Sequence, residues 1–209
     1  MKSVLLIGDS IRMGYDKAVK KSMEPYASVY FPTENSAFAC YVLRFLHEYK
    51  TFLPDGHADV IHWNAGLWDC LRSYEEDPYT PLDMYAYYIE RVCIRIKKLF
   101  PNATVIFATS TSVLTEEMSK DSIRFNEEIE AYNKCAVDIV KRYGFIVNDL
   151  YTTSLTLGKD AHSDPVHYYT PIGTEVFTNQ VISYVADALG ITEEITYQEA
   201  LYTDKPIGI

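Results

Sequence analysis

Short apolar runs rich in Val, Ile and Phe alternate along the chain with longer segments whose apolar residues recur every three or four positions. This alternation is typical of a parallel sheet with helices on both faces, because such strands are buried on both sides and such helices on one. We expect strands at residues 3–7, 28–31, 59–63, 104–109 and 145–147. Helices are expected at residues 11–24, 37–49, 81–100, 119–143 and 171–190. The pattern therefore predicts an α/β fold, a three-layer α/β/α sandwich with a parallel sheet of about five strands.

The 209 residues contain no internal repeat, no Gly/Ser linker and no compositional break. A chain of this length can bury the core of one domain. We expect that domain to span residues 1–190, and residues 191–209 to form a tail that packs on it or extends from it. A short helix is expected in the tail at residues 192–201. The loop at residues 66–81 is long enough to be a functional feature of the surface, and a second loop is expected at residues 151–169.

The chain carries 29 acidic and 19 basic side chains, a formal net charge of -10. The resulting field repels polyanions, so nucleic acid is not an expected partner. No apolar stretch approaches the length of a membrane span, and the apolar run at residues 4–7 is too short for a signal-peptide core. We therefore expect a cytoplasmic protein, although a sequence trimmed of its signal peptide would look the same. A homo-oligomer is compatible with the sequence.

The four cysteines are far apart and form no C-x-x-C pair, so a zinc site or a disulfide scaffold is not expected. Buried free thiols are the preferred interpretation. The first predicted strand is followed by neither a G-x-G-x-x-G loop nor a P-loop, which argues against a nucleotide or flavin binder. The sequence therefore predicts no metal and no cofactor.

In open α/β sheets, ligands bind beyond the carboxyl ends of the strands, so polar residues that directly follow a strand are the first candidates for a site. Three groups of residues stand out near such positions: Gly8-Asp9-Ser10 after the first strand, Asn64-Ala65-Gly66 after the third, and Asp164-Pro165-Val166-His167 before the last helix. We expect the site to be built from these groups.

Ser10 lies at a strand-to-helix turn, where free N–H groups at the start of the helix favour a developing oxyanion. A serine hydroxyl is a poor nucleophile unless a base takes its proton, and His167 can do so if its loop folds back over the strand ends. Asp164, three residues earlier, can then orient the imidazole. Each motif alone also has a simpler interpretation, in which Ser10 caps a helix and the other two residues are a surface aspartate and a structural histidine.

His162 competes with His167 because both lie in the same predicted loop, and Asp160 or Asp164 could serve either histidine. The Asp-to-His spacing and the helix that begins shortly after His167 favour His167 as the base. Three other histidines are interpreted as structural: His47, His57 and His62.

Together the three groups resemble the sequence blocks of the SGNH/GDSL hydrolases, in their order and in their placement on the predicted strands. The resemblance extends over nearly the whole chain, from residue 3 to about residue 190. It implies a flavodoxin-like sheet and ester hydrolysis through an acyl-enzyme, without a metal or a cofactor. It also implies that Ser10 attacks the ester, that His167 acts as general base and then as acid, and that Asp164 orients His167.

The resemblance further implies an oxyanion hole made of the Ser10 backbone N–H, a backbone N–H from the loop after the second strand, and an asparagine side chain. The second block of the family usually has a glycine where this chain reads Asn35-Ser36-Ala37, and we match Ser36 to it. The third block usually reads G-x-N-D, whereas this chain has Trp68 at the asparagine position. Asn64 is the expected substitute, although it could instead brace the loop by bonding backbone groups.

Asp9, Gly66 and Trp68 are the expected substrate-binding residues, with Trp68 either lining the pocket or belonging to the core. The expected substrate is a small acyl ester, most simply acetyl, with a carbohydrate as the favoured alcohol because 18 tyrosines offer rings for stacking. A lysophospholipase or thioesterase is the alternative and requires an extended apolar groove. A third interpretation is a binding module without activity, since fold alone does not establish activity.

Overall fold

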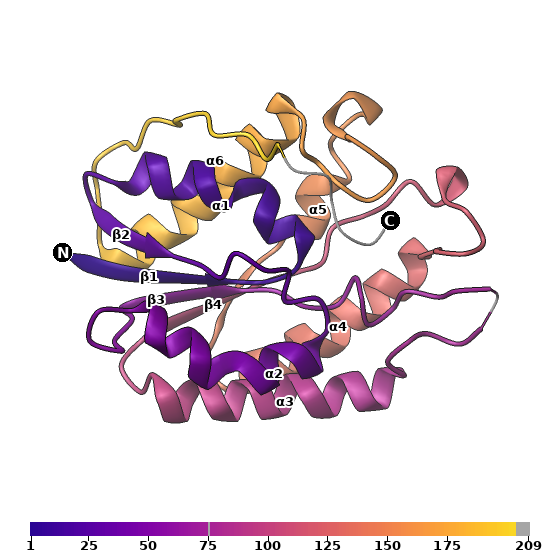
Figure 1. Cartoon of the computed structure of the whole chain (residues 1–209), viewed down its shortest axis with the longest axis horizontal. Coiled ribbons are helices and arrows are strands. Elements are labelled where there is room, and N and C mark those ends of the chain that lie inside the picture. Colours follow the sequence, from indigo (N-terminus) through magenta and orange to yellow (C-terminus); the bar gives the residue numbers. More distant parts are fainter. Residues whose placement is uncertain (75, 204–209) are drawn as a thin grey trace.

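The computed structural model describes residues 1–74 and 76–203, and in this part of the chain five parallel strands form one sheet (Figure 1). The strands are β1 (Lys2–Ile7), β2 (Ala27–Tyr30), β3 (Val60–Trp63), β4 (Thr104–Ala108) and β5 (Ile146–Asn148). Their order across the sheet is β2-β1-β3-β4-β5, and each neighbouring pair is parallel. This is the flavodoxin-like order, so the predicted fold class is confirmed.

Helices cover both faces of the sheet (Figure 1). They are α1 (Ser10–Met23), α2 (Ala39–Tyr49), α3 (Leu82–Leu99), α4 (Asn126–Arg142), α5 (Leu150–Ser154) and α6 (Pro171–Leu189). Three short 3-10 turns span Lys50–Phe52, Thr115–Glu117 and Lys159–Ala161. Helix α1 packs against α6 on one face, and α3 packs between α2 and α4 on the other. The three-layer arrangement predicted from the sequence is therefore present.

The central strands carry continuous apolar runs because both of their faces are buried. In β1 the last four residues have no exposed surface, and every residue of β3 is buried. Trp63 of β3 packs edge-on against Phe107 of β4, with 4.9 Å between the ring centroids. Burial of such large side chains in the middle layer is the main source of stability of the sheet and holds the strand ends in place.

A side chain caps the N-terminus of each of the two helices that flank the site. Asp9 accepts a hydrogen bond from the N–H of Ile11, so Ser10 becomes the first residue of α1. Thr170 accepts one from the N–H of Gly173, and Pro171 occupies the first turn of α6, where its missing N–H costs nothing. The caps fix where the two helices start relative to the strand ends.

The start of α4 was predicted incorrectly. The helix begins at Asn126 and not at residue 119, and residues 119–125 run as a loop with a 3-10-like turn and an isolated bridge between Ile123 and Arg72. The side chain of Asn126 bonds both the N–H and the C=O of Val113. These long-range bonds, which no local pattern reveals, hold the preceding segment out of the helix.

The helix expected at residues 192–201 is also absent, and this segment is irregular. Two of its backbone groups bond to side chains of α1. The N–H of Gln198 donates to Ser22 Oγ, and the C=O of Glu199 accepts from Lys21 Nζ. The tail thus packs along α1, in the yellow trace of Figure 1.

Candidate active site

A chain of hydrogen bonds links three of the predicted site residues. His167 Nε2 lies 2.7 Å from Ser10 Oγ, and His167 Nδ1 lies 2.8 Å from Asp164 Oδ2 and 2.9 Å from its Oδ1. Ser10 is 4% exposed and His167 2%, so the contacts are shielded from bulk water. The loop between α5 and α6 carries the histidine and the aspartate over the end of β1, where α1 begins.

Asp164 is held in its ionised form. Burial opposes its charge, but the hydrogen bond and charge of His167 and the N–H groups of Val166 and His167 outweigh it, so the pKa of Asp164 lies below its ordinary value. An ionised carboxylate at Nδ1 makes that nitrogen the donor, which leaves Nε2 as the acceptor facing Ser10. The arrangement can therefore take a proton from the serine hydroxyl.

Asp9 organises the turn before Ser10 and has no exposed surface. Its Oδ1 accepts from the N–H of Ile11 at 2.9 Å and from Asn64 Nδ2 at 2.8 Å. Burial raises the pKa of Asp9, and these hydrogen bonds oppose the rise. The carboxylate of Asp9 thus lies inside the protein and caps α1, and its contact with substrate stays a prediction.

Two residues at or beside the turn after β1 have N–H groups to consider as donors, Ser10 and Asn64. The Ser10 N–H is the first of α1 and has no partner within the helix. Asn64, 2% exposed, uses one amide proton on Asp9 and retains a second. Asn64 thus braces the turn through the Asp9 side chain, and its place in an oxyanion hole stays a prediction.

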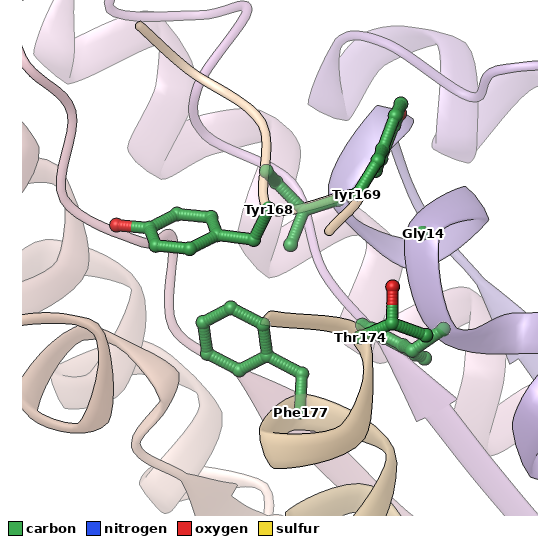
Figure 2. A pocket seen from close by; sticks show the side chains of 7 residues that line it. Gly14, Tyr168, Tyr169, Thr174 and Phe177 are labelled. Carbon is green, nitrogen blue, oxygen red and sulfur yellow. The ribbon is translucent and has the colours of Figure 1, made fainter. Parts of the chain in front are cut away.

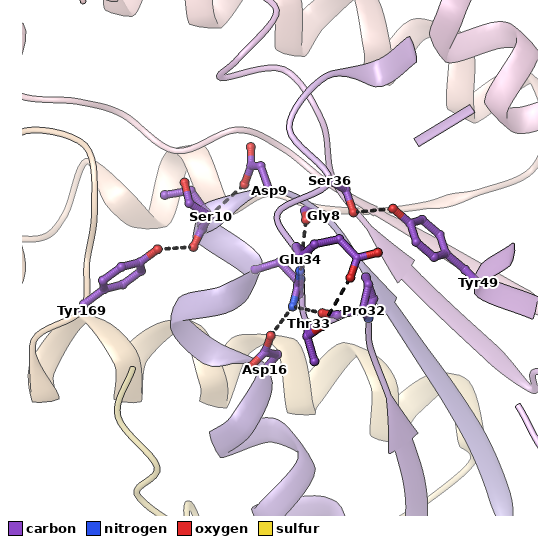
Figure 3. A network of polar contacts seen from close by, with 12 residues as sticks. Gly8, Asp9, Ser10, Asp16, Pro32, Thr33, Glu34, Ser36, Tyr49 and Tyr169 are labelled. Atoms are coloured by element: carbon purple, nitrogen blue, oxygen red, sulfur yellow. Dashed lines mark hydrogen bonds and ion pairs between the residues drawn. The ribbon is translucent and has the colours of Figure 1, made fainter. Parts of the chain in front are cut away.

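The loop after β2 does not supply the donor predicted at Ser36. The Ser36 N–H donates to the C=O of Gly8 at 3.0 Å, and its hydroxyl shares a hydrogen bond with Tyr49 (Figure 3). The next residue, Ala37, has a φ of 38°, a left-handed conformation that favours glycine. Its N–H is also engaged, by Asn35 Oδ1 at 2.8 Å. The match of Ser36 to the oxyanion hole is therefore corrected.

Arg12 is a buried clamp that the sequence analysis did not identify. Its guanidinium donates to the carbonyl groups of Pro32, Glu34 and Gly8 and to the carboxylate of Asp16. Arg12 is 1% exposed. Burial raises the pKa of its partner Asp16 to about 6, although the charge of Arg12 opposes the rise. The clamp fastens the loop after β2 to the turn that carries Ser10. Its only local signal is an arginine four residues before an aspartate.

Arg124 is a second buried cation near the site. Its Nε donates to the C=O of Leu67 in the loop after β3. Burial lowers the pKa of Arg124, while the negative charges of Asp9 and Asp164 oppose this. Since an arginine stays charged in proteins, the guanidinium offsets part of the negative charge of these two aspartates. No local pattern in the sequence indicates this placement.

Gly66 and Trp68 have different surroundings. A Cβ at Gly66 would lie 2.5 Å from Ser110 Oγ, so this buried residue serves close packing, and the expected contact with substrate is not supported. Trp68 is half-buried, and its ring lies edge-on to Phe38 with 5.6 Å between centroids. Phe38 in turn contacts Tyr79, which is 58% exposed. These three rings, here called the aromatic cluster, lie on the loops that follow β2 and β3.

The competing histidine is placed elsewhere. The ring of His162 packs on that of Tyr168, 4.0 Å between centroids, and burial lowers its pKa. His62 is buried in the sheet next to the Asn148 amide, and burial lowers its pKa to about 3, which fits the structural interpretation. His47 and His57 lie at the surface. Of the histidines, His167 is the one hydrogen-bonded to Ser10.

Asp69 ties two loops of the site together. Its carboxylate accepts from the N–H of Ala39, the first residue of α2, and its C=O accepts from the N–H of Thr80. Burial, with a contribution from the charge of Asp9, raises the pKa of Asp69 to about 7, although the bond from Ala39 opposes the rise. The folded protein therefore binds this proton more tightly than the unfolded chain.

This raised pKa predicts a loss of stability with rising pH. The Asp69 proton stabilises the fold fully below the unfolded pKa of 3.8, and this contribution is lost as pH rises towards 7. Replacing Asp69 with asparagine removes the titration. We expect the unfolding free energy of Asp69→Asn, relative to wild type, to increase by on the order of 2 kcal/mol between about pH 5 and pH 8 in urea titrations. A difference between the two proteins that does not change with pH would contradict the assignment.

In the described residues no group of three or more His, Cys, Asp or Glu side chains is arranged to hold a metal ion. No helix in the same residues is long and apolar enough to cross a membrane. The cysteines are free: Cys70 and Cys93 are buried, as expected, whereas Cys135 is half-buried and Cys40 exposed. The expectation of buried thiols is therefore wrong for Cys40.

The sequence matches no family model and no curated protein. Solved structures nevertheless share its fold over nearly its full length. A lipase/acylhydrolase from Enterococcus faecalis has a TM-score of 0.72 and 16% identity, covering 96% of this chain and 100% of that one. A GDSL-like lipase from Bacteroides thetaiotaomicron has a TM-score of 0.69 and 15% identity, covering 90% and 89%. An acetyl xylan esterase has a TM-score of 0.69 and 15% identity, covering 88% and 99%. The chain thus has the fold of GDSL-type hydrolases, as the resemblance of its motifs implies.

Proposed function

We propose that the protein is a serine esterase in which Ser10 is the nucleophile, His167 the general base and acid, and Asp164 the residue that orients His167. The hydrogen-bonded chain from Asp164 through His167 to Ser10 carries the proposal. A serine that merely caps a helix needs no imidazole at its hydroxyl, and a structural histidine needs no ionised carboxylate on its other nitrogen. The solved structures with this fold include ester hydrolases, which adds support.

In the proposed reaction, Ser10 Oγ attacks the carbonyl carbon of the ester while its proton passes to His167 Nε2. The carbonyl oxygen becomes an oxyanion that accepts hydrogen bonds from the Ser10 N–H and the Asn64 amide. The C–O bond to the alcohol then breaks, and the alcohol leaves with the proton from His167. Water attacks the acyl-enzyme with His167 again as base, releases the acid and restores Ser10.

The proposed substrate is a small acyl ester, most simply an acetyl ester, carried by a carbohydrate. The acetyl xylan esterase that shares the fold supports this choice. The aromatic cluster adds a second argument, because half-buried Trp68 and exposed Tyr79 offer ring surface on the loops after β2 and β3, where the ring of a sugar can stack. A lysophospholipase or thioesterase is the second candidate, favoured by the match to a lipase/acylhydrolase.

The test is hydrolysis by the full chain of p-nitrophenyl esters of increasing acyl length and of acetylated xylo-oligosaccharides. We expect the acetate ester to be the best aryl substrate, turnover to fall with acyl length, and acetate to be released from the sugars. A preference for long acyl chains selects the second candidate. No hydrolysis of any ester by the folded protein would refute the esterase proposal.

Asn64→Ala tests the oxyanion hole. Loss of one preorganised donor is expected to lower kcat by about a hundredfold or more, because the donor binds charge that exists only in the transition state. Asn133→Ala is the matched control, since Asn133 is also buried but only braces the backbone of Ser110. We expect its kcat to stay near that of wild type although its melting temperature falls. Equal effects of the two substitutions on kcat would show that Asn64 only braces its loop.

A further inference from the structure

Tyr169 contacts both reacting groups of the proposed site. Its hydroxyl donates to the C=O of Ser10 at 2.6 Å, and its ring lies against the imidazole of His167 with 4.8 Å between centroids. Figure 3 shows the first of these contacts beside the start of α1. Burial raises the pKa of Tyr169, so the hydroxyl stays protonated and remains a donor. One side chain therefore touches the nucleophile and the base, which come from distant parts of the chain.

The inner face of Tyr169 is tightly packed. A Cβ at Gly14 of α1 would lie 2.8 Å from the Tyr169 ring, closer than real Cβ atoms approach other atoms, so the helix needs glycine here to admit the ring. The cavity between Gly14, Tyr169, Thr174 and Phe177 measures only about 10 Å³ (Figure 2). It holds at most one water molecule. The ring cannot move inwards.

The outer face of Tyr169 is supported by the tail. The ring of Tyr202 packs on that of Tyr169 with 4.7 Å between centroids, and the ammonium group of Lys17 lies 5.2 Å from the Tyr202 ring. Two hydrogen bonds anchor the segment to α1 before it reaches this point, at Gln198 and Glu199. Figure 1 shows the tail running back over α1 and α6 towards the strand ends that carry the site.

We propose that the tail is part of the catalytic unit, with Tyr202 holding Tyr169 and Tyr169 holding Ser10 and His167 in register. Both tyrosines are positioning residues, and their role in turnover rests on the proposed esterase function. The physical basis is that a reacting geometry must be kept within a fraction of an ångström, and a small displacement costs a large factor in rate. With α1 on one face and Tyr202 on the other, the Tyr169 ring has one available position.

The experiment compares wild type with Tyr202→Ala, Tyr202→Phe and Tyr87→Ala, using p-nitrophenyl acetate. Tyr87 is the matched control, because it lies on α3 across the sheet, is 50% exposed and also packs against a tyrosine and a cation. We expect Tyr202→Ala to lower kcat by about tenfold with KM nearly unchanged, since the positioning of the reacting groups and not substrate binding is lost. We expect Tyr202→Phe, which keeps the ring, and Tyr87→Ala to have the kcat of wild type.

Gly14→Ala gives an independent test from the opposite face. Alanine is the better helix former by about 1 kcal/mol, so α1 itself gains. The added methyl group nevertheless displaces the Tyr169 ring, and we expect kcat to fall without a matching rise in KM. If Tyr202→Ala and Gly14→Ala both turn over like wild type, the positioning role is wrong.

Hydrogen exchange makes the result independent of activity. We expect the peptides around Ser10 and Tyr169 to exchange faster in Tyr202→Ala than in wild type, and equally in Tyr87→Ala and wild type. If wild type is active and Tyr202→Ala changes neither kcat nor exchange, the role of the tail is overturned. The proposed esterase function is then unaffected. Absence of esterase activity in wild type refutes the proposed function, and the exchange rates then still decide whether the tail holds these segments.

Discussion

Ser10→Ala is expected to lower the turnover of p-nitrophenyl acetate by about a millionfold, to the rate left by binding and oxyanion donors alone. The change removes the atom that forms the acyl-enzyme and leaves the fold intact. Alanine fits the space of a 4%-exposed serine whose hydroxyl, among the described residues, bonds only His167. Asp9 rather than Ser10 caps α1. Circular dichroism should be that of wild type.

The control for this variant is Ser183→Ala, which makes the same chemical change at an exposed position on α6. We expect it to hydrolyse the ester at the wild-type rate. If folded Ser10→Ala keeps more than a small part of the wild-type activity, a nucleophile other than Ser10 is responsible and the proposed mechanism fails.

His167→Ala should have an effect of similar size, about 10⁵-fold to 10⁶-fold on kcat, because the serine then has no base at 2.7 Å and the leaving alcohol has no acid. His162→Ala is the matched control, since it removes a histidine from the same loop that packs on Tyr168. We expect the control to retain its activity to within a few-fold.

Imidazole added to the assay should partly restore the His167→Ala variant, because the free base can occupy the space left by the side chain. Loss of activity in His162→Ala with little change in His167→Ala would reverse the assignment of the base. Equal losses in both variants, with intact folding, would mean that the loop as a whole and not one imidazole is needed.

The residues that could be predicted from the sequence are those whose role is local. Ser10 follows a strand and opens a helix. Asp164 lies three residues before His167, so their spacing alone places these two side chains in one loop. The parallel sheet covered by helices was likewise predicted, because apolar runs and helical periods alternate over the whole chain, whereas its flavodoxin-like order was implied only by the resemblance of the motifs. The placement of the third element, Asn64 beside the Ser10 turn, followed from its position at the end of a strand.

The failures concern contacts between distant residues. Whether the Ser36 N–H is free depends on the Gly8 carbonyl, and whether Asp9 meets substrate depends on what buries it. The roles of Arg12 and Arg124 depend on carbonyl groups of loops that lie far from them in the sequence. A helix was expected at residues 192–201 from the local pattern alone. That pattern does not show that Ser22 and Lys21 form hydrogen bonds with backbone groups of this segment.

The most direct test of the central claim is covalent labelling of the folded protein with an organophosphonate that carries a fluoride leaving group, followed by peptide mass spectrometry. Such reagents require a serine activated by a base. The account predicts one phosphonyl group per chain, on Ser10, in wild type, and none in His167→Ala. A folded wild-type protein that takes up no label, or takes it up at another residue, would contradict the account.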